Sequence, residues 1–192
     1  MPWLGFPAAV DLANTVVVGA TAEVDLLTND EELSAWAAAE RGSIPGVESI
    51  SGRLADVRDL REHVRSALFA AAEGRRLSPT DVAALNAASA EALSYPKLRE
   101  TGGLADVEEV LVGDNSFALF RAAVARSALA ILAGADRARL EVCRAPSCGM
   151  LFLRSGARQK WCCGACGNRS RVASHARRQR MSTATGEVGR RG

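Results

Sequence analysis

The cysteines of this 192-residue sequence are the residues whose spacing most clearly indicates chemistry. All five lie within 24 residues, in two close groups: Cys143 and Cys148, then Cys162, Cys163 and Cys166. Thiolates brought together by tight turns, with 13 or 14 residues between the groups, are typical of a tetrahedral zinc site. A secreted disulfide framework would spread its cysteines through the domain. The cluster therefore predicts one structural Zn²⁺ ion in a reducing, cytoplasmic protein.

The second group leaves the identity of the third ligand open. Cys163 and Cys166 are separated by two residues, the commoner gap in a zinc knuckle, whereas Cys162 leaves a gap of three. Spacing alone slightly favours Cys163. With either ligand, four sulfurs fill the coordination shell of zinc, so we expect a structural site with no open position for catalysis. The segment is too short to fold by burial alone, so the metal would supply its folding free energy.

The residues after the cluster are strongly basic. From Arg137 onward lie 13 of the 24 basic and 2 of the 22 acidic residues, so this part carries +11 and the rest carries −9. The net charge of +2 hides this division. A helix over 167–180 would place polar and basic side chains around a narrow apolar stripe. Its candidate nucleic-acid contacts are Asn168, Arg169, Arg171, Arg177, Arg178 and Arg180. Arginine suits phosphates and guanine edges through its bidentate fork, while the alternative is a solvated C-terminal helix.

The rest of the chain must position this segment. Apolar periodicity and capping residues predict helices over 28–39, 54–71, 78–93 and 115–133. Gly102 and Gly103 lie between two extended runs and predict a hairpin, and residues 3–29 have mixed helix and strand signals. We therefore expect an α+β fold: a mostly helical N-terminal domain with a few short strands, then a small treble-clef or ribbon-like zinc finger and a basic helix. The expected boundaries are 1–136, 137–181 and a disordered tail over 182–192.

Some functional classes have little support. Only two histidines occur, His63 and His175, and no Ser/His/Asp or Cys/His constellation and no Gly-rich phosphate loop is present. No uninterrupted apolar run approaches the roughly 18 residues of a membrane span, and the first nine residues lack the basic start of a signal peptide. The sequence thus predicts a cytoplasmic protein that is neither an enzyme nor a membrane protein.

The finger residues resemble a known family, the CGNR zinc-finger proteins with an N-terminal ABATE domain. The motif Cys-Gly-Asn-Arg stands at 166–169, and Trp161-Cys162 precedes it. The N-terminal resemblance lies in Phe6-Pro7 and in the run from Val10 to Thr15. The family pattern places the third ligand directly after the tryptophan, which implies Cys143, Cys148, Cys162 and Cys166 as the zinc ligands. It usually has Ser where this chain has Cys163, which we keep as the alternative.

The family is described as stress-induced transcription regulators, which implies a finger that binds double-stranded DNA. The larger domain would then sense a small-molecule effector or mediate assembly, with a homodimer as the expected oligomer. Asp11, Asn14 and Thr15, polar residues in an apolar stretch, are the candidate effector-binding residues. Their alternative role is capping and turn hydrogen bonding. The alternative functions are an RNA-binding or protein-interaction zinc ribbon, and a small-molecule-binding protein whose zinc site is purely structural.

Overall fold

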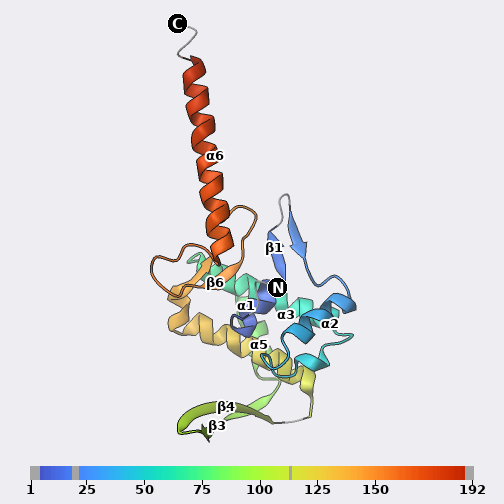
Figure 1. The fold of residues 1–192 in the computed structure, drawn as a ribbon. Helices are drawn as coiled ribbons and strands as arrows, with labels where there is room; N and C mark the ends of the chain where they lie inside the picture. The colour runs from blue at the N-terminus through green and yellow to red at the C-terminus, as the bar shows by residue number, and fades with distance from the viewer. Residues whose placement is uncertain (1–4, 19–21, 113, 189–192) are drawn as a thin grey trace.

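A computed structural model describes residues 5–18, 22–112 and 114–188. It contains mixed helices and short strands, as the sequence predicts (Figure 1). The elements are, in order, α1 (Ala8–Ala13), β1 (Val16–Val18), β2 (Glu23–Asp25), α2 (Asp30–Ala39), η1 (Val47–Ser49), α3 (Leu54–Ala72), α4 (Pro79–Ser89), β3 (Leu93–Thr101), β4 (Leu104–Val112), α5 (Ser116–Ala133), η2 (Ala135–Arg139), β5 (Leu140–Val142), β6 (Leu151–Leu153) and α6 (Gly164–Val188).

Helices α1, α3, α4 and α5 pack around one hydrophobic core. The apolar stripe of α3 is buried through Val57, Leu60, Val64 and Leu68, each at most 2% exposed. A helix with one continuous apolar face buries that face against its neighbours, and this burial supplies most of its stability. The local periodicity of α3 therefore sets both its length and its place in the core.

Helix α5 is the most apolar element and the centre of this packing. Its length and hydropathy match those of a membrane span, but it contacts α1, α3, α4 and η1 in the body. The ring of Phe120 lies edge-on to Trp36 of α2, with ring centroids 6.3 Å apart. The hydropathy of α5 is accounted for by these core contacts.

Helix starts follow the capping residues. Asn29 accepts a hydrogen bond from the backbone of Glu32 at the start of α2, and Ser78 accepts one from Thr80 at the start of α4. At the start of α5, the side chain of Asn115 accepts a hydrogen bond from the backbone N–H of Ala118 at 3.1 Å. These side chains satisfy backbone N–H groups that have no partner within the helix. Helix α4 ends at Ser89, earlier than expected, because the chain enters β3 at Leu93.

The strands form three separate antiparallel pairs, β1–β2, β3–β4 and β5–β6. The β3–β4 hairpin turns at Gly102 and Gly103, whose φ angles are 63° and 82°. Two consecutive residues with positive φ fit the tight hairpin turns that favour glycine. The N-terminal region has mixed helix and strand signals because it contains both a short helix, α1, and the strands β1 and β2.

The long helix α6 and the β3–β4 hairpin project from opposite ends of the body (Figure 1). Helix α6 has 25 residues and continues to Val188, where the sequence had predicted a disordered tail from residue 182. No proline interrupts this stretch to end the helix earlier. At about 1.5 Å per residue, α6 is about 37 Å long. The outer part of the tail, 189–192, lies outside the described residues.

Candidate metal centre and nucleic-acid interface

Four cysteine sulfurs converge at the base of α6. The Sγ atoms of Cys143, Cys148, Cys162 and Cys166 all lie within 4.8 Å of one another. The pairs 148–162, 162–166 and 166–148 are 3.7, 3.5 and 3.6 Å apart. A tetrahedral zinc site with Zn–S bonds of about 2.3 Å has S–S edges of about 3.8 Å, whereas a disulfide would need about 2.0 Å. The four thiols therefore fit one Zn²⁺ ion.

The first two ligands lie on a tight knuckle between β5 and β6. Cys143 follows β5 directly, and its backbone N–H donates to the carbonyl of Met150 at 2.8 Å. The turn contains Ser147 and Gly149, both with positive φ, at 55° and 68°. The backbone N–H of Gly149 donates to the carbonyl of Cys143 at 3.1 Å. This turn brings the side chain of Cys148 back towards that of Cys143, as a zinc knuckle requires.

The start of α6 supplies the other two ligands and separates Cys162 from Cys163. Helix α6 begins at Gly164, so Cys166 lies in its first turn and is 3% exposed. Cys162 faces the cluster from the preceding loop, and its backbone N–H lies 3.5 Å from the sulfur of Cys143. Cys163 is exposed and lies outside the group of four. The geometry therefore agrees with the ligand set that the family resemblance implied, and disagrees with the slight preference from spacing for Cys163.

The thiols would not all ionise without a cation. Burial raises the pKa of Cys166 to about 12, and burial also raises the pKa of Cys162. A bound divalent ion would lower the pKa of these thiols again, because a thiol that coordinates a metal is deprotonated. When zinc is bound, it would hold the two knuckles together and so fix where α6 begins. The donor set of four sulfurs suits zinc more than it suits the harder ions that prefer oxygen.

Two residues of the Cys-Gly-Asn-Arg motif stabilise the metal centre from outside. Arg169 donates from Nη2 to the sulfur of Cys166 at 3.0 Å. Such a hydrogen bond neutralises thiolate charge and orients the ligand. At Gly167, any Cβ would lie 3.0 Å from Cδ1 of Trp161, so the glycine allows the indole to pack on the helix. The basic run predicts Arg169 only as a nucleic-acid contact, and no local pattern indicates its bond to the cluster.

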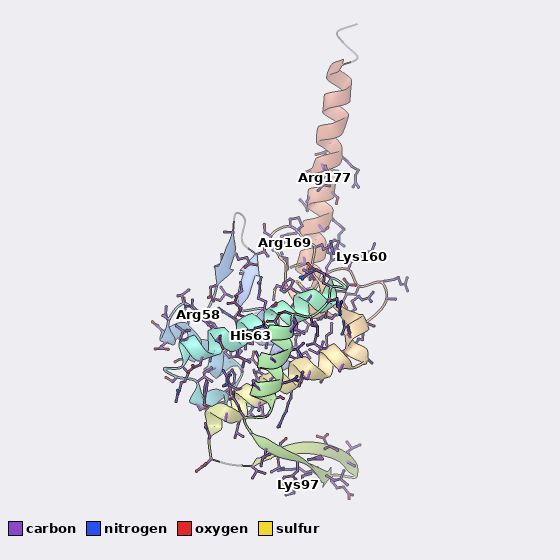
Figure 2. All side chains as sticks on the ribbon, turned by 180° about the vertical axis from the view of Figure 1, so that it is seen from behind. Arg58, His63, Lys97, Lys160, Arg169 and Arg177 are labelled. Atoms are coloured by element: carbon purple, nitrogen blue, oxygen red, sulfur yellow. The ribbon has the colours of Figure 1, made fainter. Side chains whose placement is uncertain are left out.

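The remaining predicted nucleic-acid residues lie along α6. Asn168 and Arg171 are exposed near its base and hydrogen-bond to each other. Among the residues that the structure describes, Arg177 and Arg178 are exposed without a hydrogen-bond or ion-pair partner. Figure 2 shows Arg169 close to the cysteine loops and Arg177 on the part of α6 that stands clear of the body. The side chain of Arg180 lies outside the described residues.

Further basic residues lie on the finger loops at the base of α6. Arg144, Arg158 and Lys160 are exposed, and within the described part of the chain they have no ion-pair partner. Figure 2 places Lys160 near the start of α6. The sequence predicts none of these three residues individually, although they belong to its basic C-terminal part. They extend the positive surface of α6 onto the loops of the finger.

The candidate effector residues of the N-terminal domain are buried. Asp11, Asn14 and Thr15 are at most 2% exposed. Asp11 accepts from the backbone N–H groups of Gly5 and Phe6 at 3.0–3.2 Å. Burial raises the pKa of Asp11 to about 7, and the nearby charge of Glu40 adds to this effect.

The other two candidates also bond within the protein. Both atoms of the Asn14 amide bond to the backbone of Leu151. The Thr15 hydroxyl donates to the carbonyl of Leu12 at 2.7 Å and lies 3.0 Å from Nη1 of Arg61. A ligand would have to displace these internal bonds, so the geometry favours the alternative role in capping and turns and gives no support for direct effector binding.

The comparisons with known proteins agree with this arrangement. Residues 7–135 match the ABATE family, described as "Putative stress-induced transcription regulator", and residues 139–179 match the CGNR zinc finger. The boundary between the two matches falls within η2, directly before the first zinc knuckle. No curated protein matches the sequence.

Proposed function

Because the chain belongs to the ABATE family and carries a CGNR zinc finger, we propose that it regulates transcription by binding double-stranded DNA through α6. One observation carries the proposal: α6 projects from the body (Figure 1) with Arg177 and Arg178 exposed and unpaired among the described residues. Between Glu141 and Glu187 the sequence has no acidic residue to neutralise them. A rod with this charge suits the phosphate backbone.

The metal centre orients this rod. Cys162 and Cys166 would hold zinc at the first turn of α6 and so fix that turn, where Arg169 also donates a hydrogen bond to the Cys166 sulfur. In our proposal the exposed arginines of α6 contact phosphates together with Arg180, and Asn168 and Arg171 lie at the base of α6, where they would contact a base edge. Phosphate contacts position a protein on DNA, while base contacts supply specificity. Zinc removal should therefore abolish binding without changing any residue that touches DNA.

A salt titration of the zinc-loaded protein on a duplex tests the proposal. If about five phosphates are contacted, log K should fall with log salt with a slope of about −4 to −5. The double variant Arg177→Gln/Arg178→Gln should lose about two units of this slope, and Arg121→Gln, whose guanidinium pairs with Glu91 on the body, should not change it. No duplex binding at low salt would overturn the proposal.

The same assay separates DNA from the alternative partners. We expect genomic duplex DNA to compete for the protein better than single-stranded or duplex RNA of equal length. Stronger competition by RNA would support an RNA-binding ribbon instead.

We also propose that the protein works in the cytoplasm, because its free thiols suit a reducing compartment. We propose no reaction for the chain.

We further propose that the protein works as a homodimer whose body responds to a small molecule. A single helix offers few base-reading side chains, so paired half-sites would add specificity. The β3–β4 hairpin supports self-association, because Leu93 and Leu104 are 73% and 78% exposed and the hairpin is a sheet of two strands only. An isolated two-stranded hairpin is at best marginally stable in water.

A further inference from the structure

A groove of about 800 Å³ lies between β2 and α3, on the body and away from α6. Three arginines line it from successive turns of one face of α3: Arg58, Arg61 and Arg65. Figure 2 shows Arg58 on the side of the body where the β1–β2 pair stands. The volume falls in the range of small-molecule sites.

The hydrogen bonds inside this arginine groove leave donors without acceptors. Arg61 makes three hydrogen bonds: two to the carboxylate oxygens of Asp25, at 2.6 and 2.7 Å, and one to the hydroxyl of Thr15. Arg58 gives Asp25 a single bond of 2.8 Å. Among the described residues, the Nε atoms of Arg58 and Arg65 are buried and have no acceptor. Buried N–H groups almost always have a partner in native proteins.

The third arginine is held by a replaceable partner. Arg65 pairs with Glu23 of β2, whose side chain is 54% exposed. The Arg65 guanidinium also stacks on the ring of Phe69, with Cζ 4.7 Å from its centroid. A guanidinium already positioned by an aromatic ring is preorganised to bind a carboxylate or phosphate through two parallel bonds.

The rim of the groove limits which anions fit. Asp59 and Glu62, both exposed on α3, also line it. With Glu23 and Asp25 they match the charge of the four arginines present, including Arg75. A neutral lining gives a long polyanion such as DNA no general attraction, whereas a small oxyanion that displaces the exposed Glu23 can bind the Arg65 guanidinium. The groove is thus chemically distinct from the basic surface of α6.

A short strand pair joins this groove to the zinc knuckle. Glu23 of β2 pairs in register with Val18 of β1. The backbone N–H of Val18 donates to the carbonyl of Cys148, a zinc ligand, at 3.3 Å. On the neighbouring Gly149, a Cβ would lie only 2.2 Å from Cγ2 of Val18, so the strand rests directly on the knuckle.

We propose that the arginine groove binds a small oxyanion, a carboxylate- or phosphate-bearing molecule, which takes the place of Glu23 on Arg65 and thereby changes how β1 holds the first zinc knuckle. This deepens the proposed function, because it assigns the effector a site and a chemical class. Binding to the groove does not itself depend on DNA. By linkage, an oxyanion that loosens this contact would change DNA affinity, and DNA would change oxyanion affinity by the same factor.

Calorimetry with sodium phosphate and sodium succinate at matched ionic strength tests the site. The zinc-loaded full chain carries Arg177→Gln/Arg178→Gln, so that α6 contributes little to anion binding. We expect saturable binding of at least one probe, and the probe that binds identifies the headgroup class. Glu23→Gln removes the competing carboxylate and should tighten binding about fivefold or more, whereas Arg65→Gln and Arg58→Gln should each weaken it about tenfold or more. Arg121→Gln, outside the groove, is the matched control.

The proposed site is overturned if neither probe binds the parent or its Glu23→Gln variant, or if both groove-arginine variants bind like the parent while remaining folded by circular dichroism. The coupling between the arginine groove and the first zinc knuckle is measured separately, from the amide resonances of Val18 and Gly149. They should shift on saturation with the probe, and the shifts should vanish with Arg65→Gln. Binding without these shifts would overturn the coupling. Neither measurement contains DNA, so a failure of the proposed DNA binding leaves both results interpretable.

Discussion

The side-chain amide of Asn14 clamps the backbone of Leu151 with two hydrogen bonds, one to its carbonyl and one from its N–H. Its Nδ2 donates to the Leu151 carbonyl at 3.0 Å, and its Oδ1 accepts from the Leu151 N–H at 2.9 Å, in a buried setting. Asn14 follows α1 in the N-terminal domain, while Leu151 begins β6 of the finger. This pair therefore ties the ABATE domain to the zinc finger, and it explains a polar residue that the sequence left open as an effector contact.

Asn14→Ala should destabilise the protein by about 2–4 kcal/mol, because it removes two buried hydrogen bonds and leaves both backbone groups of Leu151 unpaired. Thermal or denaturant unfolding of the zinc-loaded protein measures this. Asn86→Ala on the exposed face of α4 is the matched control and should change stability by less than about 0.5 kcal/mol. Equal stability of the two variants would show that the clamp contributes nothing.

Cys162→Ser should lose tight zinc binding, and Cys163→Ser should keep it. Only the first removes a sulfur from the group of four, while Cys163 is exposed outside it. Zinc per chain, measured by elemental analysis after dialysis against a weak chelator, should be near zero and near one respectively. The reverse pattern would reassign the third ligand to Cys163.

The β3–β4 hairpin should mediate self-association. Leu98 and Val107 are cross-strand partners and are 71% and 61% exposed. Leu98→Glu places a charge on this apolar surface and should shift the protein towards monomer in sedimentation velocity. Asn86→Glu, on the exposed face of α4, adds the same charge outside the hairpin and should leave the sedimentation coefficient unchanged. If the wild-type protein is monomeric at micromolar concentration, the dimer proposal is wrong.

Features that depend on neighbouring residues, such as helix positions and caps, were predictable from the sequence. Features that depend on tertiary contacts were not. The stripe of α3 and the caps Asn29 and Ser78 involve neighbours within one helix. The choice between two adjacent cysteines depends on which one faces the cluster when α6 begins at Gly164, and spacing does not encode that orientation. The Asn14 clamp joins residues 137 positions apart, so no local pattern could have indicated it.

The roles of the arginines likewise divide into those that the sequence predicts and those that depend on tertiary contacts. The basic C-terminal part was evident from charge counts, but the turn of Arg169 towards the Cys166 sulfur depends on the folded knuckle. The arginine groove was missed because the acids that pair with its arginines, Glu23 and Asp25, come from β2, whereas those arginines come from α3, and α2 and η1 separate the two elements in the chain. On a helix surface alone, Arg58, Arg61 and Arg65 resemble an ordinary solvated face.

Asp11→Asn should remove a pH dependence of stability. In the folded state the pKa of Asp11 is about 7, raised from 3.8 chiefly by burial and next by Glu40. The folded protein thus keeps a proton that the unfolded chain releases above about pH 4, so stability falls as pH rises from about 4 to 7. At about 1.4 kcal/mol per pKa unit, the full effect is about 4 kcal/mol.

The measurement is the difference in unfolding free energy between Asp11→Asn and the wild type at each pH. The zinc site also responds to acid, but it is common to both proteins and cancels in that difference. We expect Asp11→Asn to gain stability relative to the wild type as pH rises through this window, with a plateau above about pH 8. A difference that stays constant with pH would show that Asp11 is ionised in the folded protein.

Gly149→Ala tests the contact between β1 and the first zinc knuckle. Gly149 has a φ of 68°, and a Cβ there would lie 2.2 Å from Cγ2 of Val18. Alanine must therefore accept a left-handed backbone and also push Val18 away from the knuckle, at a combined cost of about 2–3 kcal/mol. We expect a lower melting temperature and faster zinc transfer to a chromogenic chelator. Gly156→Ala, in open space on the same finger, should show neither effect, and equal zinc-transfer rates for the two variants would mean that β1 does not support the metal centre.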